Sequence, residues 1–190
     1  MDETRLRAIA ADSAALKVAF AERSAAVVIA AARTMCESLR AGGRVLTFGN
    51  GGSAADAQHL AGELVGRYLR DRPGLPALAL TTDPTIVTAV GNDFGFEAVF
   101  RRQVEAHGRA GDVAVGITTS GRSPNVLAAL RAARERGMRT IALTGEGGRV
   151  LAGEVDHLID VPSTFTPRIQ EVHTMVVHLL CEIVEEALAP

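Results

Sequence analysis

Residues 45–53 read VLTFGNGGS, a short apolar segment followed at once by a glycine-rich turn. An apolar run of this length without polar alternation is typical of a strand buried on both faces, as in a parallel sheet. The glycines let the backbone bend tightly, and from Ser53 to about Tyr68 apolar residues recur at helical spacing. The segment therefore predicts a strand, a tight turn and a helix, the repeating unit of α/β folds.

The same alternation of strands and helices continues along the chain. Further strands are predicted at 76–80, 112–118, 140–144 and 157–161. Further helices are predicted at 85–90, 97–107, 123–136, 149–153 and 167–187. Alternation of this kind implies right-handed crossovers, so we expect a five-stranded parallel sheet flanked by helices on both faces.

The first 41 residues are rich in alanine and carry apolar residues at helical spacing. We expect two helices here, separated near residues 22–24, where Ser24 could cap the second helix. Ala41-Gly42-Gly43 then ends that helix. These helices and the apolar final helix carry more apolar surface than one small sheet can bury. We therefore expect helices to pack between protomers in a homotetramer. The chain is predicted to form one domain, with N-terminal helices over 1–41 and an α/β core and C-terminal helix over 42–190.

Composition excludes several classes of protein. Of the 190 residues, 47% are hydrophobic and 22% are charged, with a net charge of −2, which argues against disorder and against a dedicated nucleic-acid binder. No apolar run is long enough for a transmembrane helix. The acidic N-terminus lacks the apolar core of a secretory signal, and Cys36 and Cys181 share no metal spacing. We therefore expect a cytoplasmic protein with reduced cysteines.

The two loops that follow the first and third predicted strands could hold a phosphate. Ligands of parallel sheets bind at the carboxyl ends of the strands, where residues 49–53 and 118–123 both lie. Glycines, hydroxyls and a helix N-terminus suit an anion, although either loop alone could be an ordinary turn before a capped helix. The only lysine is Lys17, far from both loops, so a sugar phosphate fits better than a magnesium-bound nucleotide.

Acid–base residues lie on two of the predicted helices. His59 and Glu63 are four residues apart and share a helix face with Asp56, a spacing that suits a metal site, a general base or a plain surface pair. In the last helix, His178 lies among apolar residues and could be a buried or interface histidine, whereas we interpret His173 as helix surface.

Gln170 precedes His178 by eight residues, a rise of about 12 Å along a helix. If both side chains bind one metal ion, the helix is irregular at its start or the site lies between subunits.

Five segments resemble the SIS (sugar isomerase) domain family and, within it, the isomerases of heptose phosphates. They are GNGGSAADAQHLAGELVGRY (49–68), VGNDFGFEAVF (90–100), GDVAVGITTSGRSPNVLAAL (111–130), GMRTIALTGEGG (137–148) and RIQEVH with a later histidine (168–178). The resemblance implies a flavodoxin-like SIS fold. It also implies the conversion of sedoheptulose 7-phosphate to D-glycero-D-manno-heptose 7-phosphate through an enediol, the first step of bacterial heptose precursor synthesis, whether for lipopolysaccharide or another product.

The resemblance also implies roles for individual residues. Glu63 would be the base and His178 its acid–base partner. One zinc ion per subunit would be held by His59, Glu63, Gln170 and His178. The substrate would be contacted by Asn50, Gly51, Gly52, Ser53, Glu63, Arg67, Asn92, Asp93, Thr118, Thr119, Ser120, Ser123 and Gln170. We expect sites at subunit interfaces, a sugar phosphate as ligand, and neither a membrane nor a nucleic acid as partner.

Other readings of the same resemblance remain open. The ending LLCEIVEEAL (179–188) is similar to a non-catalytic, tetrameric SIS scaffold that associates with the replication initiator. The presence of the full acid–base set favours catalysis over that role. A sugar-phosphate sensor would be expected to carry a DNA-binding domain, and other SIS isomerases would not be expected to carry the RIQE segment.

Overall fold

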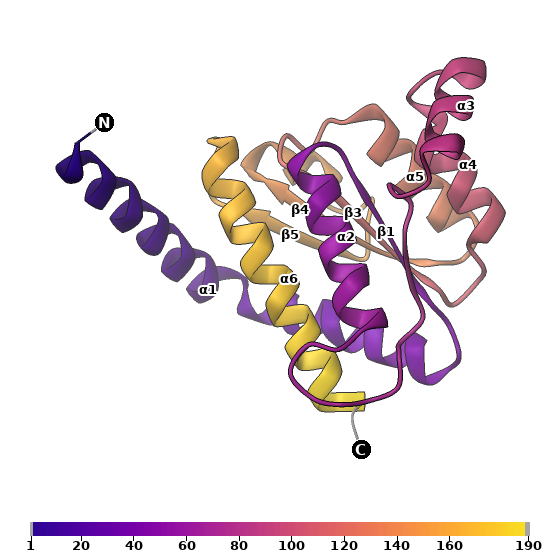
Figure 1. The fold of residues 1–190 in the computed structure, drawn as a ribbon, viewed down its shortest axis with the longest axis horizontal. Helices are drawn as coiled ribbons and strands as arrows, with labels where there is room; N and C mark the ends of the chain where they lie inside the picture. The colour runs from indigo at the N-terminus through magenta and orange to yellow at the C-terminus, as the bar shows by residue number, and fades with distance from the viewer. Residues whose placement is uncertain (1, 189–190) are drawn as a thin grey trace.

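The computed structural model of the chain describes residues 2–188, which form a five-stranded parallel sheet between two layers of helices (Figure 1). The strands are β1 (Val45–Gly49), β2 (Ala77–Ala79), β3 (Val113–Thr118), β4 (Arg139–Gly145) and β5 (His157–Val161). Their order in the sheet is β2-β1-β3-β4-β5, and every neighbouring pair is parallel. In this order the chain reverses direction across the sheet between β1 and β3, which is where such folds bind ligands.

The helices cover the sheet on both faces, as the alternating pattern predicts. They are α1 (Glu3–Arg40), α2 (Gly52–Val65), α3 (Pro84–Phe94), α4 (Ala98–His107), α5 (Pro124–Glu135), a 3₁₀ helix (Glu146–Leu151) and α6 (Thr166–Leu188). Residues of α1, α2 and α6 share one buried cluster with the sheet, and residues of α4 and α5 share the other, with α3 at its margin. The predicted fold class and every predicted strand are confirmed, with boundaries shifted by a few residues.

The prediction of two N-terminal helices is wrong, because α1 is one uninterrupted helix of 38 residues. Its N-cap is Asp2, whose side chain accepts a hydrogen bond of 2.8 Å from the backbone N–H of Arg5. Ser24, the predicted cap, is instead buried against the core. Residues 22–24 include no glycine or proline, so nothing in the backbone breaks the helix there. The burial of Phe20, Ser24 and Val28 on the core then stabilises it as one helix. Gly42, with φ of 82°, does follow the end of the helix as predicted.

Only the second half of α1 packs closely on the rest of the chain. From Phe20 onward its buried residues contact β5 and α6, whereas its first half extends away from the body (Figure 1). At the other end of the molecule, α3 contains no buried residue and packs on α4. Within residues 2–188, no helix combines the length and apolar character needed to cross a bilayer.

Candidate active site

The two predicted phosphate loops meet at the carboxyl ends of β1 and β3, where they line a cavity of about 310 Å³. The cavity also receives side chains from the start of α6. Its lining residues are Asn50, Gly51, Gly52, Ser53, Ile117, Thr118, Thr119, Ser123, Thr166 and Gln170. Most of the predicted substrate contacts, from three separate parts of the chain, are therefore brought to one place by the fold.

Three hydroxyls gather on the β3 side of this cavity. The Oγ1 atom of Thr118, at the end of β3, lies 2.8 Å from Oγ of Ser123 and 3.4 Å from Oγ of Ser120. Ser123 is at the N-cap of α5, yet its side chain makes no capping hydrogen bond and turns toward Thr118 instead. Hydroxyls beside free N–H groups at a helix N-terminus form a neutral cradle for an anion.

Glycines on the β1 side are required by close contacts. A Cβ atom on Gly49 would lie 2.8 Å from the carbonyl oxygen of Ile117, and Gly51 has φ of 56°. A Cβ atom on Gly52 would lie 2.2 Å from Nε2 of Gln170. The absence of a side chain on Gly52 therefore lets the Gln170 amide rest on the first turn of α2.

Asn125, which no sequence pattern singled out, holds one of the lining residues of the cavity. Its side-chain amide donates to Oδ1 of Asn50 at 2.8 Å, and Asn50 donates in return to Oδ1 of Asn125 at 2.9 Å. This paired amide contact ties the β1 loop, which lines the cavity, to the first turn of α5. An asparagine just inside a helix, after Ser-Pro, was the only local signal.

A second group of side chains lies farther along the seam between α2 and α6. The Nε2 atom of His59 is 3.2 Å from Oε1 of Glu63 and 3.4 Å from Nε2 of His178. The ring of Tyr68 lies 5.6 Å from the ring of His178. The predicted i, i+4 pair therefore does face the histidine of the last helix, from a position that is only partly buried.

These distances fit a metal ion. Two ligands of a tetrahedral zinc ion, each about 2.0–2.1 Å from it, lie about 3.3–3.4 Å apart. The His59–Glu63 and His59–His178 contacts are close to that separation. Across residues 2–188, no three His, Cys, Asp or Glu side chains are arranged as a ready metal site. The agreement with zinc geometry is therefore limited to two separate pairs of side chains, and His59 belongs to both.

Gln170 is not brought to this second group. Its amide lies against Gly52, and about two helical turns, or ~10 Å, separate Gly52 from His59 along α2. Between the two groups, Oγ1 of Thr174 donates to the buried carboxylate of Asp56 at 3.0 Å. Burial raises the pKa of Asp56, while the Thr174 hydroxyl and nearby His59 act in the opposite direction.

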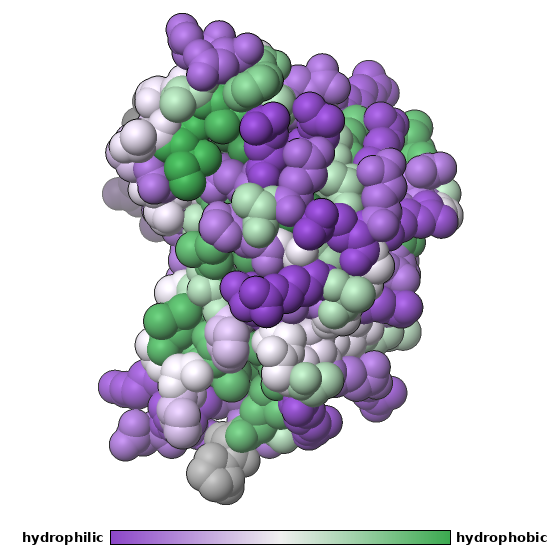
Figure 2. Space-filling model, turned by 90° about the vertical axis from the view of Figure 1, so that its right-hand side faces the viewer, coloured by the Kyte–Doolittle hydropathy of each residue, from purple (hydrophilic) through white to green (hydrophobic). Residues whose placement is uncertain are grey.

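Three predicted substrate residues lie away from the cavity within this chain. Arg67 is exposed just after α2. Asn92 and Asp93 are exposed on α3, where the Asn92 amide donates to Oδ1 of Asp93 at 2.8 Å. The face of the molecule that carries α3 mixes hydrophobic and hydrophilic side chains at its surface (Figure 2), and Phe94 and Phe96 there are more than half exposed.

The interpretation of His173 as helix surface is wrong. His173 is fully buried, and its Nε2 atom lies 3.1 Å from the carbonyl oxygen of Thr144 at the end of β4. Burial lowers the pKa of His173 to about 4, although the contact with Thr144 acts in the opposite direction. The signal was its spacing from Ile169 and Val176, which places it on the apolar face of α6.

Comparison with known proteins gives one consistent family. Residues 10–145 match the SIS domain family. The phosphoheptose isomerase of Rhodospirillum rubrum is 58% identical over 164 residues, which cover 86% of this chain and 87% of the relative. The solved phosphoheptose isomerase of Neisseria gonorrhoeae is 45% identical, with a TM-score of 0.91 over 97% of this chain and 98% of that chain. That of Francisella tularensis is 38% identical, with a TM-score of 0.93 over 98% of this chain and 100% of that chain.

Proposed function

Because this chain belongs to the SIS domain family and resembles phosphoheptose isomerases along nearly its whole length, we propose that it isomerises sedoheptulose 7-phosphate to D-glycero-D-manno-heptose 7-phosphate in heptose precursor synthesis. One observation about the site carries this proposal. A hydroxyl-lined cavity lies at the start of α2, and a group of acid–base side chains lies farther along the same helix. A sugar phosphate has two such ends, an anion and a reactive carbonyl.

We assign the proton transfers to Glu63 and His178. The reaction moves a proton from C1 of the ketose to C2 of the product, and a second proton between the two oxygens. The Glu63 carboxylate would take the carbon-bound proton and return it to the neighbouring carbon. His178 would donate to one oxygen and accept from the other, since an imidazole can do both near neutral pH.

The hydroxyl cradle would hold the phosphate. Thr118, Ser120 and Ser123 offer three hydroxyls at the start of α5, and Ser53 with the Gln170 amide faces them across the cavity. Backbone N–H groups at the starts of α2 and α5 would add to this attraction, because helix N-termini favour anions. Binding the remote phosphate in this way would hold the reacting carbons in place.

The cluster around His59 would hold one zinc ion, as the distances between its members favour. His59, Glu63 and His178 would be ligands, and Gln170 would complete the set only by leaving its place against Gly52. When bound, the ion would supply polarisation of the sugar oxygens. A carboxylate that binds a metal is a weaker base, so turnover in the presence of chelator would show that Glu63 acts as the base without the ion.

We further propose a cytoplasmic homotetramer with sites completed at subunit interfaces. The exposed positions of Arg67, Asn92 and Asp93 support this, because these predicted substrate residues do not line the cavity of their own chain. The half-exposed α1 and the exposed phenylalanines near α3 offer apolar surface for a second copy.

The test is a direct assay of the purified protein with sedoheptulose 7-phosphate, with added zinc or with chelator. Formation of the aldose is followed by NMR for the wild type, Glu63→Gln and His178→Ala. We expect turnover by the wild type and a loss of at least about 100-fold in each variant, the usual contribution of a general acid or base.

A folded tetramer that shows no turnover with zinc or with chelator would contradict the proposed activity. The hypothesis of a non-catalytic scaffold would then be favoured, and a pull-down with the replication initiator would be the next experiment. Loss of activity with chelator alone, restored by zinc, would support a catalytic ion.

A further inference from the structure

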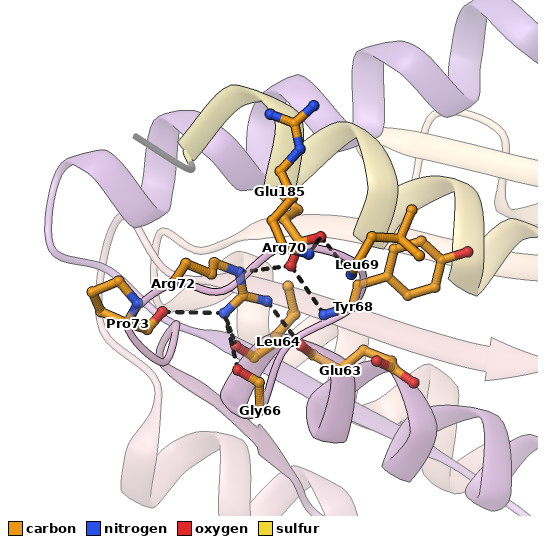
Figure 3. A network of polar contacts seen from close by, with 9 residues as sticks. All are labelled: Glu63, Leu64, Gly66, Tyr68, Leu69, Arg70, Arg72, Pro73 and Glu185. Carbon is orange, nitrogen blue, oxygen red and sulfur yellow. Dashed lines mark hydrogen bonds and ion pairs between the residues drawn. The ribbon is translucent and has the colours of Figure 1, made fainter.

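The loop that joins α2 to β2 is anchored by a buried ion pair (Figure 3). The Nε atom of Arg72, in this loop, lies 3.1 Å from Oε1 of Glu185, near the end of α6. Each of the two side chains is 2% exposed. A buried ion pair persists only where its remaining donors and acceptors are satisfied, so the other contacts of this pair matter.

Arg72 closes the C-terminal end of α2. The last carbonyls of a helix have no partner within it. The Nη2 atom of Arg72 donates to the carbonyl oxygen of Glu63 at 2.9 Å, and Nη1 donates to that of Leu64 at 2.9 Å. Weaker contacts reach the carbonyl oxygens of Gly66 and Pro73. The planar guanidinium thus holds the helix end and the loop together.

Glu185 accepts hydrogen bonds from backbone N–H groups of the same loop. Its carboxylate accepts from the backbone nitrogens of Tyr68 at 3.0 Å, Leu69 at 2.6 Å and Arg70 at 2.8 Å. Burial alone would raise the pKa of Glu185, but these three donors and the Arg72 guanidinium hold the pKa below its usual range. The carboxylate therefore stays ionised and fully satisfied in its buried position.

Both contacts end on the backbone of residues in the proposed proton-transfer site. The carbonyl that Arg72 binds belongs to Glu63, and the amide that Glu185 binds belongs to Tyr68, whose ring lies 5.6 Å from that of His178. Glu185 also follows His178 by seven residues, about two turns along the same face of α6. The ion pair thus joins the backbone of the base to the helix of its acid–base partner.

We propose that Arg72 and Glu185 are positioning residues that hold Glu63 and Tyr68 against His178 for proton transfer. This inference rests on the proposed roles of Glu63 and His178. The phosphate cavity is at the opposite end of α2, so loss of the ion pair should disturb the chemistry far more than substrate binding.

Tyr68 supplies a readout that is independent of activity. The chain has one tyrosine and no tryptophan, so the intrinsic fluorescence of the protein comes from Tyr68. In Glu185→Gln and Arg72→Lys we expect lower Tyr68 fluorescence anisotropy and greater quenching by acrylamide. We also expect kcat to fall by about 10- to 100-fold, as for a small misplacement of a catalytic group, with KM within about threefold of wild type.

Asp112→Asn is the matched control. Asp112 is also a buried carboxylate that accepts from backbone N–H groups, those of Arg44 at 3.0 Å and Arg109 at 2.9 Å, but it lies just before β3, at the end of the sheet away from the site. This variant should lose stability while keeping the wild-type kcat and Tyr68 signal.

The inference would be overturned if both ion-pair variants matched the Asp112→Asn control in kcat and anisotropy. It would also be overturned if neither variant folded, because the ion pair would then serve the stability of the whole chain. An inactive wild type with a Tyr68 signal that still depends on the ion pair would refute the proposed function alone.

Discussion

At the scale of single residues, the structure separates side chains that the sequence places together. Gln170, His173 and His178 lie within nine positions of one helix, yet each has a different environment. Gln170 lines the cavity at the ends of β1 and β3, His173 is buried against β4, and His178 faces His59. Helix geometry alone accounts for this, because offsets of three, five and eight residues point in different directions and to different heights.

His173 should make the protein less stable in mild acid. Its pKa of about 4 in the folded state lies below the ordinary value of 6.5, so the unfolded state binds more protons between these values. Stability from this group is complete above pH 6.5 and is lost as the pH falls toward 4. Urea unfolding at pH 7.5 and 5.0 should therefore differ by about 2 kcal/mol more in the wild type than in His173→Gln. Equal pH dependence in the two proteins would refute the assignment.

Gly52→Ala should weaken substrate binding. The new Cβ atom would lie 2.2 Å from Nε2 of Gln170, so the amide must leave the cavity wall. Loss of one hydrogen bond to a charged phosphate raises KM by about tenfold or more. Gly62→Ala, in the same helix with no atom within 4 Å of its Cβ, serves as the control and should instead stabilise the protein by about 1 kcal/mol. Unchanged kinetics for Gly52→Ala would exclude Gln170 from phosphate binding.

At the scale of elements, α1 behaves as two halves of one helix. The second half contributes Phe20, Val28 and Met35 to the core, whereas the first half borders an open groove of about 510 Å³ beside α6. Leu6 in this groove is 59% exposed. A long helix whose first half exposes Leu6 and Val18 beside an open groove is expected to pack on another copy of the chain.

Leu6→Glu should break the proposed tetramer without unfolding the chain. The carboxylate is harmless in an isolated protomer, because Leu6 is mostly exposed there, but it would be buried without a partner in a helix-to-helix interface. We expect light scattering after gel filtration to show species smaller than a tetramer, with unchanged circular dichroism. Arg7→Ala, on the neighbouring exposed position, should remain tetrameric. A Leu6→Glu tetramer would show that this groove is not an interface.

At the scale of the whole molecule, the sheet order determines where chemistry can occur. The reversal between β1 and β3 leaves a gap at their carboxyl ends, and both glycine- and hydroxyl-rich loops open into it. The seam between α2 and α6 then extends from this gap to the cluster around His59. One cavity and one helix seam therefore bring together all the groups to which we assign a role, apart from the three exposed substrate residues.

Zinc should stabilise the folded protein as a whole. A ligand at about 100 times its Kd adds about 2.7 kcal/mol to the free energy of unfolding, which raises Tm by about 5–11 °C in a chain of this size. The shift should appear in calorimetry with zinc, vanish with chelator, and be absent in His59→Asn, because His59 is the shared member of both close contacts. An equal shift in His59→Asn would place the ion elsewhere.

Much of the fold was predictable because its signals are local. The strand at 45–49, the glycine turn after it and the helical spacing of His59 and Glu63 each depend on neighbours within a few residues. The failures were also local in origin. A weak break signal at residues 22–24 was overridden by packing of α1, and His173 was assigned to the surface although its spacing matched the apolar face.

The alternation of strands and helices and the glycine- and hydroxyl-rich loops after β1 and β3 are predictable from the sequence alone, because spacing within a few residues encodes both. Which of these groups meet depends on the packing of distant parts of the chain. Asn50 pairs with Asn125 across 75 positions, and Arg72 pairs with Glu185 across 113. Such contacts depend on how α2, α5 and α6 pack around the sheet, and no local pattern specifies the height and angle at which two helices meet.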